Sequence, residues 1–560
     1  MTGGRGFDVV IVGAGFAGMY MLHRVRGLGL SACVFEAGCG VGGTWYWNRY
    51  PGARCDIESM EYSYQFSDEL QQQWHWSERF ASQPEILRYA NHVADRFGLR
   101  EHIRFETRVI GASFDEAASQ WRVRVAPAAG ASADTGTAAA AAGDEIAARF
   151  LIMATGCLSS TNMPAIEGIE TFAGEKYHTG QWPHEPVEFT GRRVGVIGTG
   201  SSAVQSIPII AGQARQLVVF QRTATYSVPA HNGPLDPEYE ARIKADYGGF
   251  RARNKLMPNA FGSNLPRNDA PALSVSEEER RQAYEARWRR GGLVLLGAFG
   301  DVMLDARANE TAAEFVRAKI RGIVHDPEVA ELLTPRQVIG GKRLCVDTGY
   351  YETFNRPNVK LVDVGRHPIE RITPGGIRSG GRDYALDCIV FATGFDAMTG
   401  TLLKMDIRGR SGLTLRERWH AGPRTYLGLG VAGFPNLFTI SGPGSPSVLT
   451  NMLVSIEQHV DWIAECIAWM QQRGCRVVEP TEAAQDAWVE HVNAVADKTL
   501  YPNCNSWYLG ANVPGKTRVF MPLIGFPGYV RKCDEVKAAG YEGFVFEPEP
   551  RSRSASPAKG

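Results

Sequence analysis

The chain contains two glycine-rich turns that each follow a short apolar run. The first run, residues 9–12, leads into Gly13-Ala14-Gly15-Phe16-Ala17-Gly18, and the second, residues 194–197, leads into Gly198-Thr199-Gly200-Ser201-Ser202-Ala203. Glycines at this spacing permit a tight strand-to-helix turn, where backbone N–H groups can bind a pyrophosphate. The sequence therefore predicts an α/β fold with two Rossmann-like dinucleotide-binding domains. The predicted contacts are Gly13, Gly15 and Gly18 at the first turn, and Gly198, Thr199, Gly200, Ser201, Ser202 and Ala203 at the second.

The residue that ends the next strand after each turn indicates which nucleotide binds there. Glu36 ends the apolar run 32–35, and a carboxylate at that place accepts hydrogen bonds from a ribose diol. Gln221 occupies the corresponding place after the second turn and is followed by Arg222 and Thr223. A neutral residue beside a cation suits a 2′-phosphate, which a carboxylate would repel. We therefore expect FAD at the first turn and NADPH at the second, with Glu36, Arg222 and Thr223 among the contacts.

Composition narrows the classes of function. The 560 residues include 60 basic and 60 acidic side chains, so no basic field points to nucleic acid or an anionic membrane. No apolar stretch approaches the roughly 20 residues of a membrane-spanning helix, and the first apolar run begins too early for a signal peptide to precede it. The 10 cysteines form no CxxC pair, which argues against a disulfide reductase and fits a reducing compartment. We expect a cytoplasmic protein with no metal site, no nucleic-acid partner and no membrane association.

Two later segments indicate how the domains are connected. Residues 151–156 and 389–394 are each an apolar run that ends in Ala-Thr-Gly, where glycine lets the backbone pass close to a nucleotide. One such strand for each domain indicates that the second domain is inserted in the first. Residues 235–335 have a helical pattern, with a capping box at Ser276 and Glu279. The expected units are the FAD domain at 1–160 and 389–546, the NADPH domain at 161–234 and 336–388, an all-helical insertion at 235–335, and a disordered tail at 547–560.

Two other segments have patterns of their own. Residues 126–148 are rich in alanine and glycine and lie between two strand-like runs, so we expect an exposed hairpin insertion that binds no ligand. Near the end, apolar residues at helical spacing from Met452 to Ile467 are closed by Gly474, which predicts an amphipathic helix.

Several motifs resemble those of one enzyme family. The segment Phe172–Pro183 has the form FxGxxxHxxxWP, which resembles the signature of type I Baeyer–Villiger monooxygenases. Other similar segments are 42–52, 54–56, 342–343, 442–452 and 507–516, so the resemblance spans roughly residues 8–546. Residues 442–452 are most similar to the phenylacetone and steroid monooxygenase branch. The resemblance implies an FAD- and NADPH-dependent enzyme that uses O2 and a flavin peroxide to insert one oxygen atom next to the carbonyl of a small-molecule ketone, giving an ester or lactone.

The resemblance also implies roles for individual residues. Arg343 would be the catalytic cation that stabilises the peroxide and the adduct, because a guanidinium stays charged in a dry site, and Asp56 would pair with it. Adjacent side chains of an extended segment point to opposite faces, so Lys342 could join Arg222 at the 2′-phosphate. The remaining implied cofactor contacts are Thr44, Trp45, Arg54, Cys55, Asp56, Tyr62 and Met452 for the flavin, the backbone of Val109 for the adenine, and Trp507 for the nicotinamide.

Alternatives to these roles stay open at the level of sequence. Core packing could explain Trp45, Tyr62, Val109 and Met452, and Trp507 could be an ordinary loop aromatic. His178 and Trp182 in the signature are expected to have structural roles rather than to transfer protons. The alternative functions are an N- or S-oxygenating flavin monooxygenase, an uncoupled NADPH oxidase, and a nucleotide-binding sensor without turnover. The kind of ketone, the selectivity and the oligomeric state are not predicted by the sequence.

Overall fold

The computed structural model describes residues 6–128, 143–511, 513–516 and 521–548 of the chain. The run Phe7–Val12 forms strand β1, in which Val9, Val10 and Ile11 are fully buried, as expected for a central parallel strand covered on both faces. It pairs in parallel with β2 and β6 in an eight-stranded mixed sheet of order β17-β4-β5-β6-β1-β2-β3, in which β18 also pairs with β6. The other strands are β2 (Ala32–Phe35), β3 (Ile103–Arg104), β4 (Thr107–Asp115), β5 (Gln120–Pro127), β6 (Asp144–Met153), β17 (Asp406–Arg408) and β18 (Leu437–Thr439).

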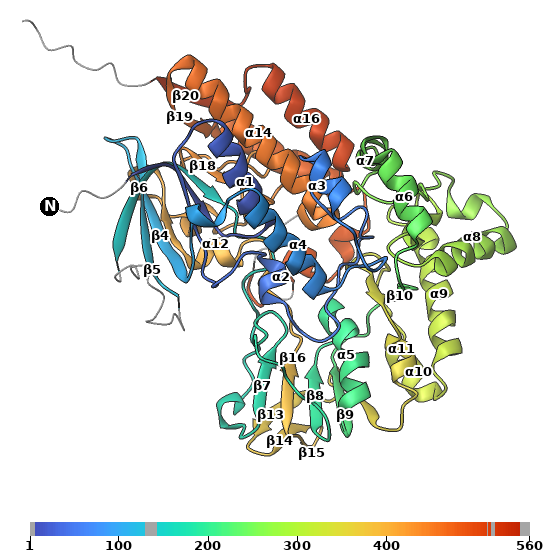
Figure 1. Ribbon diagram of the computed structural model, residues 1–560. Helices are drawn as coiled ribbons and strands as arrows, with labels where there is room; N and C mark the ends of the chain where they lie inside the picture. The colour runs from blue at the N-terminus through green and yellow to red at the C-terminus, as the bar shows by residue number, and fades with distance from the viewer. Residues whose placement is uncertain (1–5, 129–142, 512, 517–520, 549–560) are drawn as a thin grey trace, which may run out of the picture.

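A second sheet forms the lower lobe in Figure 1, and all of its pairings are parallel. Its order is β12-β9-β8-β16-β7. A small antiparallel sheet of β13, β14 and β15 contributes Ile372 and Ile377 to the apolar core that also contains Phe220 of β9. The strands are β7 (Glu175–His178), β8 (Arg193–Ile197), β9 (Gln216–Gln221), β12 (Val359–Asp363), β13 (Ile369–Thr373), β14 (Gly376–Ser379), β15 (Arg382–Ala385) and β16 (Cys388–Phe391).

The two sheets confirm the predicted α/β class with nested Rossmann-like domains, and they correct one boundary. The domain boundary expected between residues 388 and 389 falls inside β16 (Cys388–Phe391), which pairs with β7 and β8 of the second sheet along its length. The chain therefore returns to the first sheet only after β16, at β17. Strand β16 belongs to the second domain because the Ala-Thr-Gly that follows it supports the second glycine turn, where Ala392 faces Gly198. The Ala-Thr-Gly after β6 supports the first turn in the same way, with Ala154 facing Gly13.

Residues 235–335 form helices and contain no strand, as expected for the helical insertion. The predicted capping box is present at Ser276 and Glu279, and α9 buries Ala312, Val316 and Ile320. The insertion packs on two cores, because α6 and α7 join the core of the first domain while α8 and α9 join that of the second. The helices are α6 (Pro237–Ala245), α7 (Tyr247–Lys255), α8 (Glu277–Arg290), α9 (Ala306–Ile323) and α10 (Pro327–Leu333).

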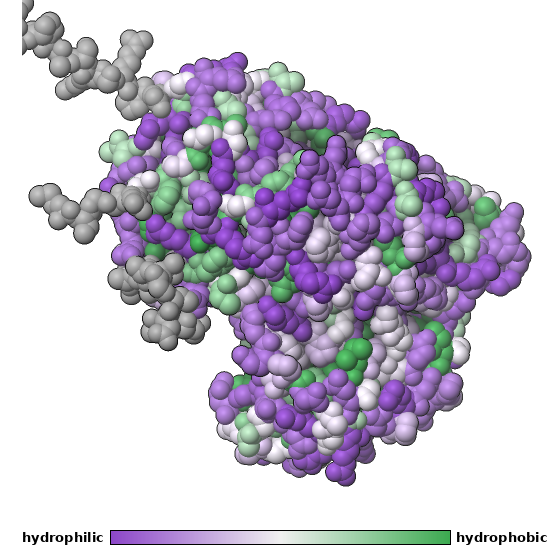
Figure 2. Space-filling view, viewed as in Figure 1, coloured by the Kyte–Doolittle hydropathy of each residue, from purple (hydrophilic) through white to green (hydrophobic). Residues whose placement is uncertain are grey.

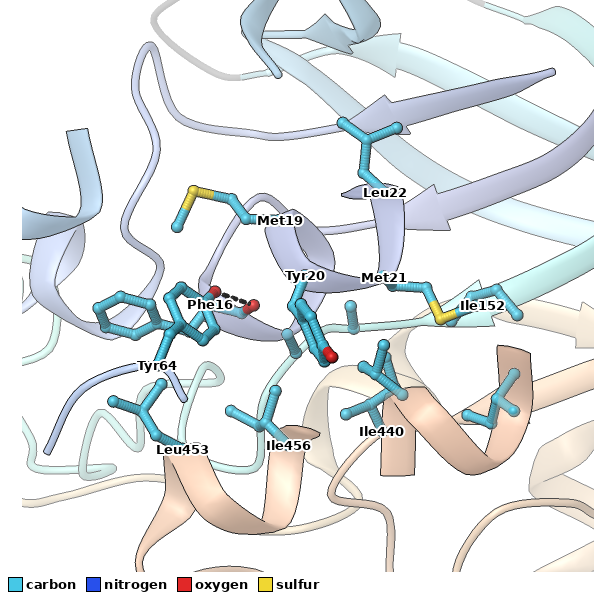
Figure 3. Packing of buried hydrophobic residues seen from close by; sticks show 14 of the residues in the cluster. Phe16, Met19, Tyr20, Met21, Leu22, Tyr64, Ile152, Ile440, Leu453 and Ile456 are labelled. Carbon is cyan, nitrogen blue, oxygen red and sulfur yellow. Dashed lines mark hydrogen bonds between the residues drawn. The ribbon is translucent and has the colours of Figure 1, made fainter. Parts of the chain in front are cut away.

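Helices α1 (Phe16–Gly27) and α14 (Met452–Arg473) pack against each other beside the first sheet, and Figure 3 shows Tyr20, Tyr64 and Ile456 between them. The Tyr20 hydroxyl donates to Asp461 Oδ1 at 2.8 Å, and α14 ends at Gly474 in the left-handed conformation, as its pattern predicts. The other helices are α2 (Thr44–Trp47), α3 (Asp68–Gln73), α4 (Gln83–Arg96), α5 (Ser201–Gln213), α11 (Tyr350–Thr353), α12 (Gly400–Lys404), α13 (Leu415–Arg418), α15 (Glu482–Ala496) and α16 (Phe526–Ala538).

Two predicted irregular segments are only partly described. Strands β5 and β6 pair in antiparallel fashion up to Val125 and Asp144, which fits the expected hairpin, and residues 129–142 lie outside the described part. The predicted tail begins too early, because Glu547 and Pro548 belong to β20 (Phe544–Pro548), which pairs with β19 (Cys475–Pro480); residues 549–560 lie outside the described part.

The surface in Figure 2 is mainly hydrophilic, with apolar residues interspersed. The exposed large apolar residues, such as Met163, Leu256 and Leu304, lie on separate elements and need no partner to cover them. Among the helices of the described residues, none has the length and apolar character needed to cross a membrane. Within the same residues, no cluster of three or more His, Cys, Asp or Glu side chains is arranged to hold a metal ion.

Candidate active site

The first glycine turn joins β1 to α1 and lies against the end of β6. Gly13 has a φ of +102°, and a Cβ there would lie 2.7 Å from the carbonyl oxygen of Ala154. A Cβ at Gly18 would collide with the carbonyl of Gly13, so only glycine lets the helix start this close to the turn. Gly15 is the N-cap of α1 and has no side chain to cover the N–H groups that follow. The turn therefore has the geometry that a pyrophosphate requires.

Glu36 lies at this same turn. Its side chain is 6% exposed, and its carboxylate accepts hydrogen bonds from the backbone N–H groups of Ala14 and Gly38, both at 2.8 Å. Burial raises the pKa of Glu36, while the two N–H groups oppose the rise by stabilising the charged form. The carboxylate thus lies beside the glycines, at the place where a ribose next to the pyrophosphate would lie.

The proposed flavin-side residues differ in where their side chains lie. Thr44 begins α2, and in the same helix Trp45 donates from Nε1 to the hydroxyl of Tyr62 at 3.2 Å. The side chain of Arg54 points elsewhere, since it donates to Glu78 Oε2 at 2.6 Å and to the carbonyl of Phe80. Val109 and Cys55 are buried: Val109, on β4, packs in the core that also contains Val10 and Val12 of β1, and burial raises the pKa of the Cys55 thiol.

The second glycine turn repeats the geometry of the first. Gly198 has a φ of +111°, and a Cβ there would lie 2.5 Å from the carbonyl oxygen of Ala392. Gly200 is the N-cap of α5, and a Cβ at Gly200 would meet nothing within 4 Å, so this face of the turn is open. The hydroxyl of Thr199 donates to the carbonyl of Thr223 at 2.8 Å. Of the other residues of the turn, Ser201 contacts Cys345, Ser202 contacts Thr179, and Ala203 is buried.

A positively charged hollow lies beside this turn. A cavity of about 100 Å³ is lined by Thr223, Lys342, Asn505 and their neighbours. Burial lowers the pKa of Lys342, and the positive charge of Arg222 lowers it further, so these two cations lie near each other. Within the described residues neither makes an ion pair with a carboxylate. Two close cations without a counter-ion fit a bound anion such as a 2′-phosphate.

Arg343 is held by groups from three parts of the chain. Its Nε and Nη2 donate to Asp56 Oδ2 and Oδ1 at 2.5 and 2.8 Å, and its Nη1 donates to the carbonyl of Val448 at 2.8 Å. Tyr508 is also hydrogen-bonded to Arg343. Burial opposes the charge of Arg343, but the carboxylate of Asp56 outweighs it and raises the pKa of the guanidinium. The result is a permanent positive charge in a fixed orientation.

An apolar cluster borders this cation through Val448 and Tyr508. Met452, the first residue of α14, and Trp507, the first residue of the short helix Trp507–Leu509, pack with Val448, Cys157 and Tyr508. The ring centroids of Trp507 and Tyr508 are 4.4 Å apart. Lys342 and Arg343 diverge, one toward Arg222 and the other toward Asp56. Polar chemistry at Arg343 would therefore take place among apolar side chains.

His178 and Trp182 of the signature have structural surroundings. His178 is 4% exposed, accepts from the N–H of Gly180 at its Nδ1, and lies 3.3 Å from the Thr393 hydroxyl through its Nε2. Burial lowers its pKa, which favours the neutral ring. Trp182 packs between Tyr177 and Phe189. His178 thus connects the end of β7 to the Ala-Thr-Gly after β16.

Sequence reasoning missed residues that complete the site. Tyr508 follows Trp507 within the segment 507–516, so that segment already indicates that Tyr508 lies near the site. The Val448 carbonyl and Gln205, which contacts the segment before Asp56, depend on tertiary contacts that leave no local pattern.

The chain is similar to known monooxygenases over nearly its whole length. A family described as FMO-like, flavin-binding monooxygenase-like, matches residues 7–232. A Baeyer–Villiger monooxygenase of Pseudooceanicola batsensis is 43% identical over 549 residues, which cover 97% of each chain. This chain belongs to the Baeyer–Villiger monooxygenase family. The predicted family is thereby confirmed.

Two further matches are a solved structure and a second curated relative. The structure of an oxidised steroid monooxygenase bound to NADP matches with a TM-score of 0.90 and 52% identity, covering 97% of this chain and all of that one (100%). This agrees with the branch that residues 442–452 indicate. A phenazine N-monooxygenase of Lysobacter antibioticus is 40% identical and covers 98% of both chains.

Proposed function

We propose that this chain is an FAD- and NADPH-dependent monooxygenase that inserts one oxygen atom from O2 next to the carbonyl of a small-molecule ketone, giving an ester or lactone. The observation that carries the proposal is the two-point pairing of Arg343 with Asp56 beside an apolar cluster. When bound, NADPH supplies a hydride and FAD supplies the chemistry that activates O2. The protein's own part is to bind, orient and shield the reactants.

The cofactor assignment is supported by the shape and charge of the two turns. The first turn and Glu36 would hold FAD, since Gly13 and Gly18 have no room for a side chain and Glu36 lies beside them. Thr44, Trp45, Arg54, Cys55, Asp56, Tyr62 and Met452 would contribute the flavin-side contacts, and the backbone of Val109 would contact the adenine. The second turn would hold NADPH, with Arg222, Thr223 and Lys342 on its 2′-phosphate and Trp507 over its nicotinamide.

Arg343 would act on the charge that develops during oxygen insertion. When a nucleophile adds to a ketone, the carbonyl oxygen becomes negative, and a fixed cation lowers the barrier most in a site from which water is excluded. Asp56 and the Val448 carbonyl would keep the guanidinium oriented, so it need not reorganise during the reaction. Asp56 is thus a positioning partner as well as a counter-ion.

One assay tests the function directly. The FAD-loaded enzyme is incubated with NADPH, O2 and a panel of cyclic, linear, aryl and steroid ketones, and esters are measured by mass spectrometry alongside hydrogen peroxide. Ester formed in step with NADPH consumption supports the proposal. Hydrogen peroxide equal to the NADPH consumed, with no ester from any ketone, would instead identify an uncoupled oxidase.

N-oxygenation is the second candidate, because a phenazine N-monooxygenase is 40% identical over nearly the whole chain. Its substrate is a nucleophilic nitrogen, which does not need a cation to stabilise a carbonyl adduct. Adding phenazines to the same panel separates the two: N-oxide without ester favours this candidate.

The proposal includes a cytoplasmic location, where NADPH is available. It is supported by the 10 cysteines, all of which are free thiols, including the exposed Cys39.

A further inference from the structure

Helix α5 carries a buried amide that crosses from the second domain to the first. Gln205 lies in the second turn of α5, and its side chain is 8% exposed. Its Oε1 accepts hydrogen bonds from the Tyr50 hydroxyl at 2.9 Å and from the Arg54 N–H at 3.4 Å, and its Nε2 donates to the Arg54 carbonyl at 3.1 Å. The amide thus pairs with both backbone groups of Arg54, as a neighbouring strand would.

The segment that Gln205 holds also packs closely on the helix backbone. Gly52 has a φ of +79°, and a Cβ there would collide with the carbonyl oxygen of Gln205. Arg54 is held on its other side by Glu78 and Phe80, and the N–H of Cys55 donates to the carbonyl of Ala81. A movement of α5 would therefore be passed to Arg54 through well-defined contacts.

The same helix also contacts the chain close to the other half of the ion pair. The hydroxyl of Ser201, at the start of α5, lies 3.4 Å from the Cys345 sulfur. Arg54 is two residues before Asp56, and Cys345 is two residues after Arg343. One stretch of α5 thus contacts the chain close to both members of the pair.

The start of α5 is also the place where the second nucleotide would bind. Gly200 caps the helix with an open face, so phosphates would contact the first N–H groups of α5. Pro208 lies inside the helix and cannot donate to the carbonyl of Val204. The residues Ser201 and Gln205 therefore lie before an interruption in the helical hydrogen bonding, and a nucleotide at the start of the helix would meet less resistance to shifting this part than an unbroken helix offers.

We propose that Gln205 is a positioning residue that transmits the seating of a dinucleotide on the turn Gly198–Ala203 to the Asp56–Arg343 ion pair. The inference rests on the proposed function, because it takes that nucleotide to be NADPH. Coupling of this kind requires that the nucleotide changes the contacts of α5 and that these contacts reach the site. Gln205 supplies the link to Asp56, since its side-chain amide is bonded to the backbone just before that residue.

Hydrogen–deuterium exchange of the FAD-loaded enzyme tests the coupling without any ketone. In the wild type, saturating NADP⁺ should slow exchange in residues 50–56 by about threefold or more. In Gln205→Met, which removes all three hydrogen bonds, NADP⁺ should still bind within about threefold of its wild-type Kd, but this slowing should disappear. Because the readout is the difference made by NADP⁺, a general loosening of the segment does not produce the expected result.

Two further variants complete the design. Gln213→Met changes an exposed glutamine at the end of the same helix and should keep the full NADP⁺ effect. Tyr50→Phe removes one hydrogen bond and should weaken the effect, which decides the question if Gln205→Met does not fold. The proposal is overturned if the wild-type segment does not respond to NADP⁺, or if Gln205→Met, or Tyr50→Phe in its place, responds fully.

Turnover separates this inference from the proposed function. With a ketone that the wild type converts, Gln205→Met should raise the ratio of hydrogen peroxide to ester by about fivefold, while flavin reduction at saturating NADPH changes by less than about twofold. A wild type that makes no ester would contradict the proposed function, yet the exchange experiment would still test Gln205.

Discussion

Arg343 and Asp56 lie 287 residues apart in the sequence and meet in a two-point ion pair, with Nε–Oδ2 and Nη2–Oδ1 distances of 2.5 and 2.8 Å. Asp56 comes from the first domain, while Arg343 follows the helical insertion that interrupts the second. Their side chains are only 20% and 23% exposed. The pair therefore joins the two domains where the proposed chemistry takes place, and its integrity depends on how those domains are held together.

Asp56→Asn should impair oxygenation while the chain still folds. Asparagine keeps the shape of Asp56 but leaves Arg343 without its counter-ion and with one acceptor fewer. We expect ester formation to fall by about tenfold or more, because a misplaced cation stabilises the developing charge poorly. Stopped-flow absorbance should show that NADPH still reduces the flavin. Full ester formation by this variant would remove Asp56 from the catalytic arrangement.

Lys342→Ala and Arg222→Ala should distinguish NADPH from NADH. Lys342 lines the hollow beside Thr223, and the charge of Arg222 acts on Lys342, so each variant removes a cation from the place where a charge-assisted hydrogen bond to phosphate contributes about 1.5–3 kcal/mol. The KM for NADPH should rise by about tenfold or more, and the KM for NADH should change little. Arg215→Ala, an exposed cation of the same domain, is the control. Equal losses for both nucleotides would contradict the 2′-phosphate assignment.

Gly198→Ala and Gly200→Ala lie in one turn but should impair different properties, the first the stability of the fold and the second nucleotide binding. Gly198 has a positive φ and faces the Ala392 carbonyl, so alanine there should destabilise the fold by about 1–3 kcal/mol. Gly200 has an ordinary φ of −78° and open space at its Cβ position, so alanine should leave Tm unchanged but obstruct the nucleotide. Thermal unfolding and NADP⁺ titration measure the two effects. A Gly200→Ala variant with normal NADP⁺ affinity would show that the nucleotide does not approach this face.

Glu457→Gln should stabilise the protein at high pH and have little effect at low pH. Burial raises the pKa of Glu457 to about 7, and its carboxylate accepts from the N–H groups of Gln65 and Phe66. Between the ordinary carboxyl pKa and about 7, the folded state binds a proton that the unfolded state does not, so stability falls as pH rises through this window. At about pH 8 the neutral glutamine should avoid a cost of up to about 3 kcal/mol, and at about pH 4.5 the difference should vanish.

Thermal unfolding at both pH values measures this difference. Glu490→Gln, an exposed residue of α15, is the matched control and should change Tm equally little at both. If Glu457→Gln were equally neutral at high pH, the buried carboxylate would not be titrating as its surroundings imply.

The sequence predicted best what short-range chemistry determines. Gly13 and Gly198 are recognisable because only glycine fits their φ and their close backbone neighbours, and Glu36 lies beside its turn because strand length fixes its place. Arg343 was found through a motif resemblance, whose family is confirmed. The boundary after residue 388 was wrong although the Ala-Thr-Gly after β16 indicates one such strand for each domain, because the pairing of β16 with β8 that decides its sheet is a tertiary contact.

Other features had no local signal. The division of the helical insertion between two cores depends on which apolar face meets which partner. Gln205 could not be found because a helical glutamine shows its role only when Arg54 lies beside it in space.

The most direct test of the central claim is the ratio of ester formed to NADPH consumed by Arg343→Ala with a ketone that the wild type converts. The account predicts that NADPH still reduces the flavin of this variant, while the ester ratio falls by about 10²-fold or more and hydrogen peroxide replaces the ester. An ester ratio near that of the wild type would contradict the account.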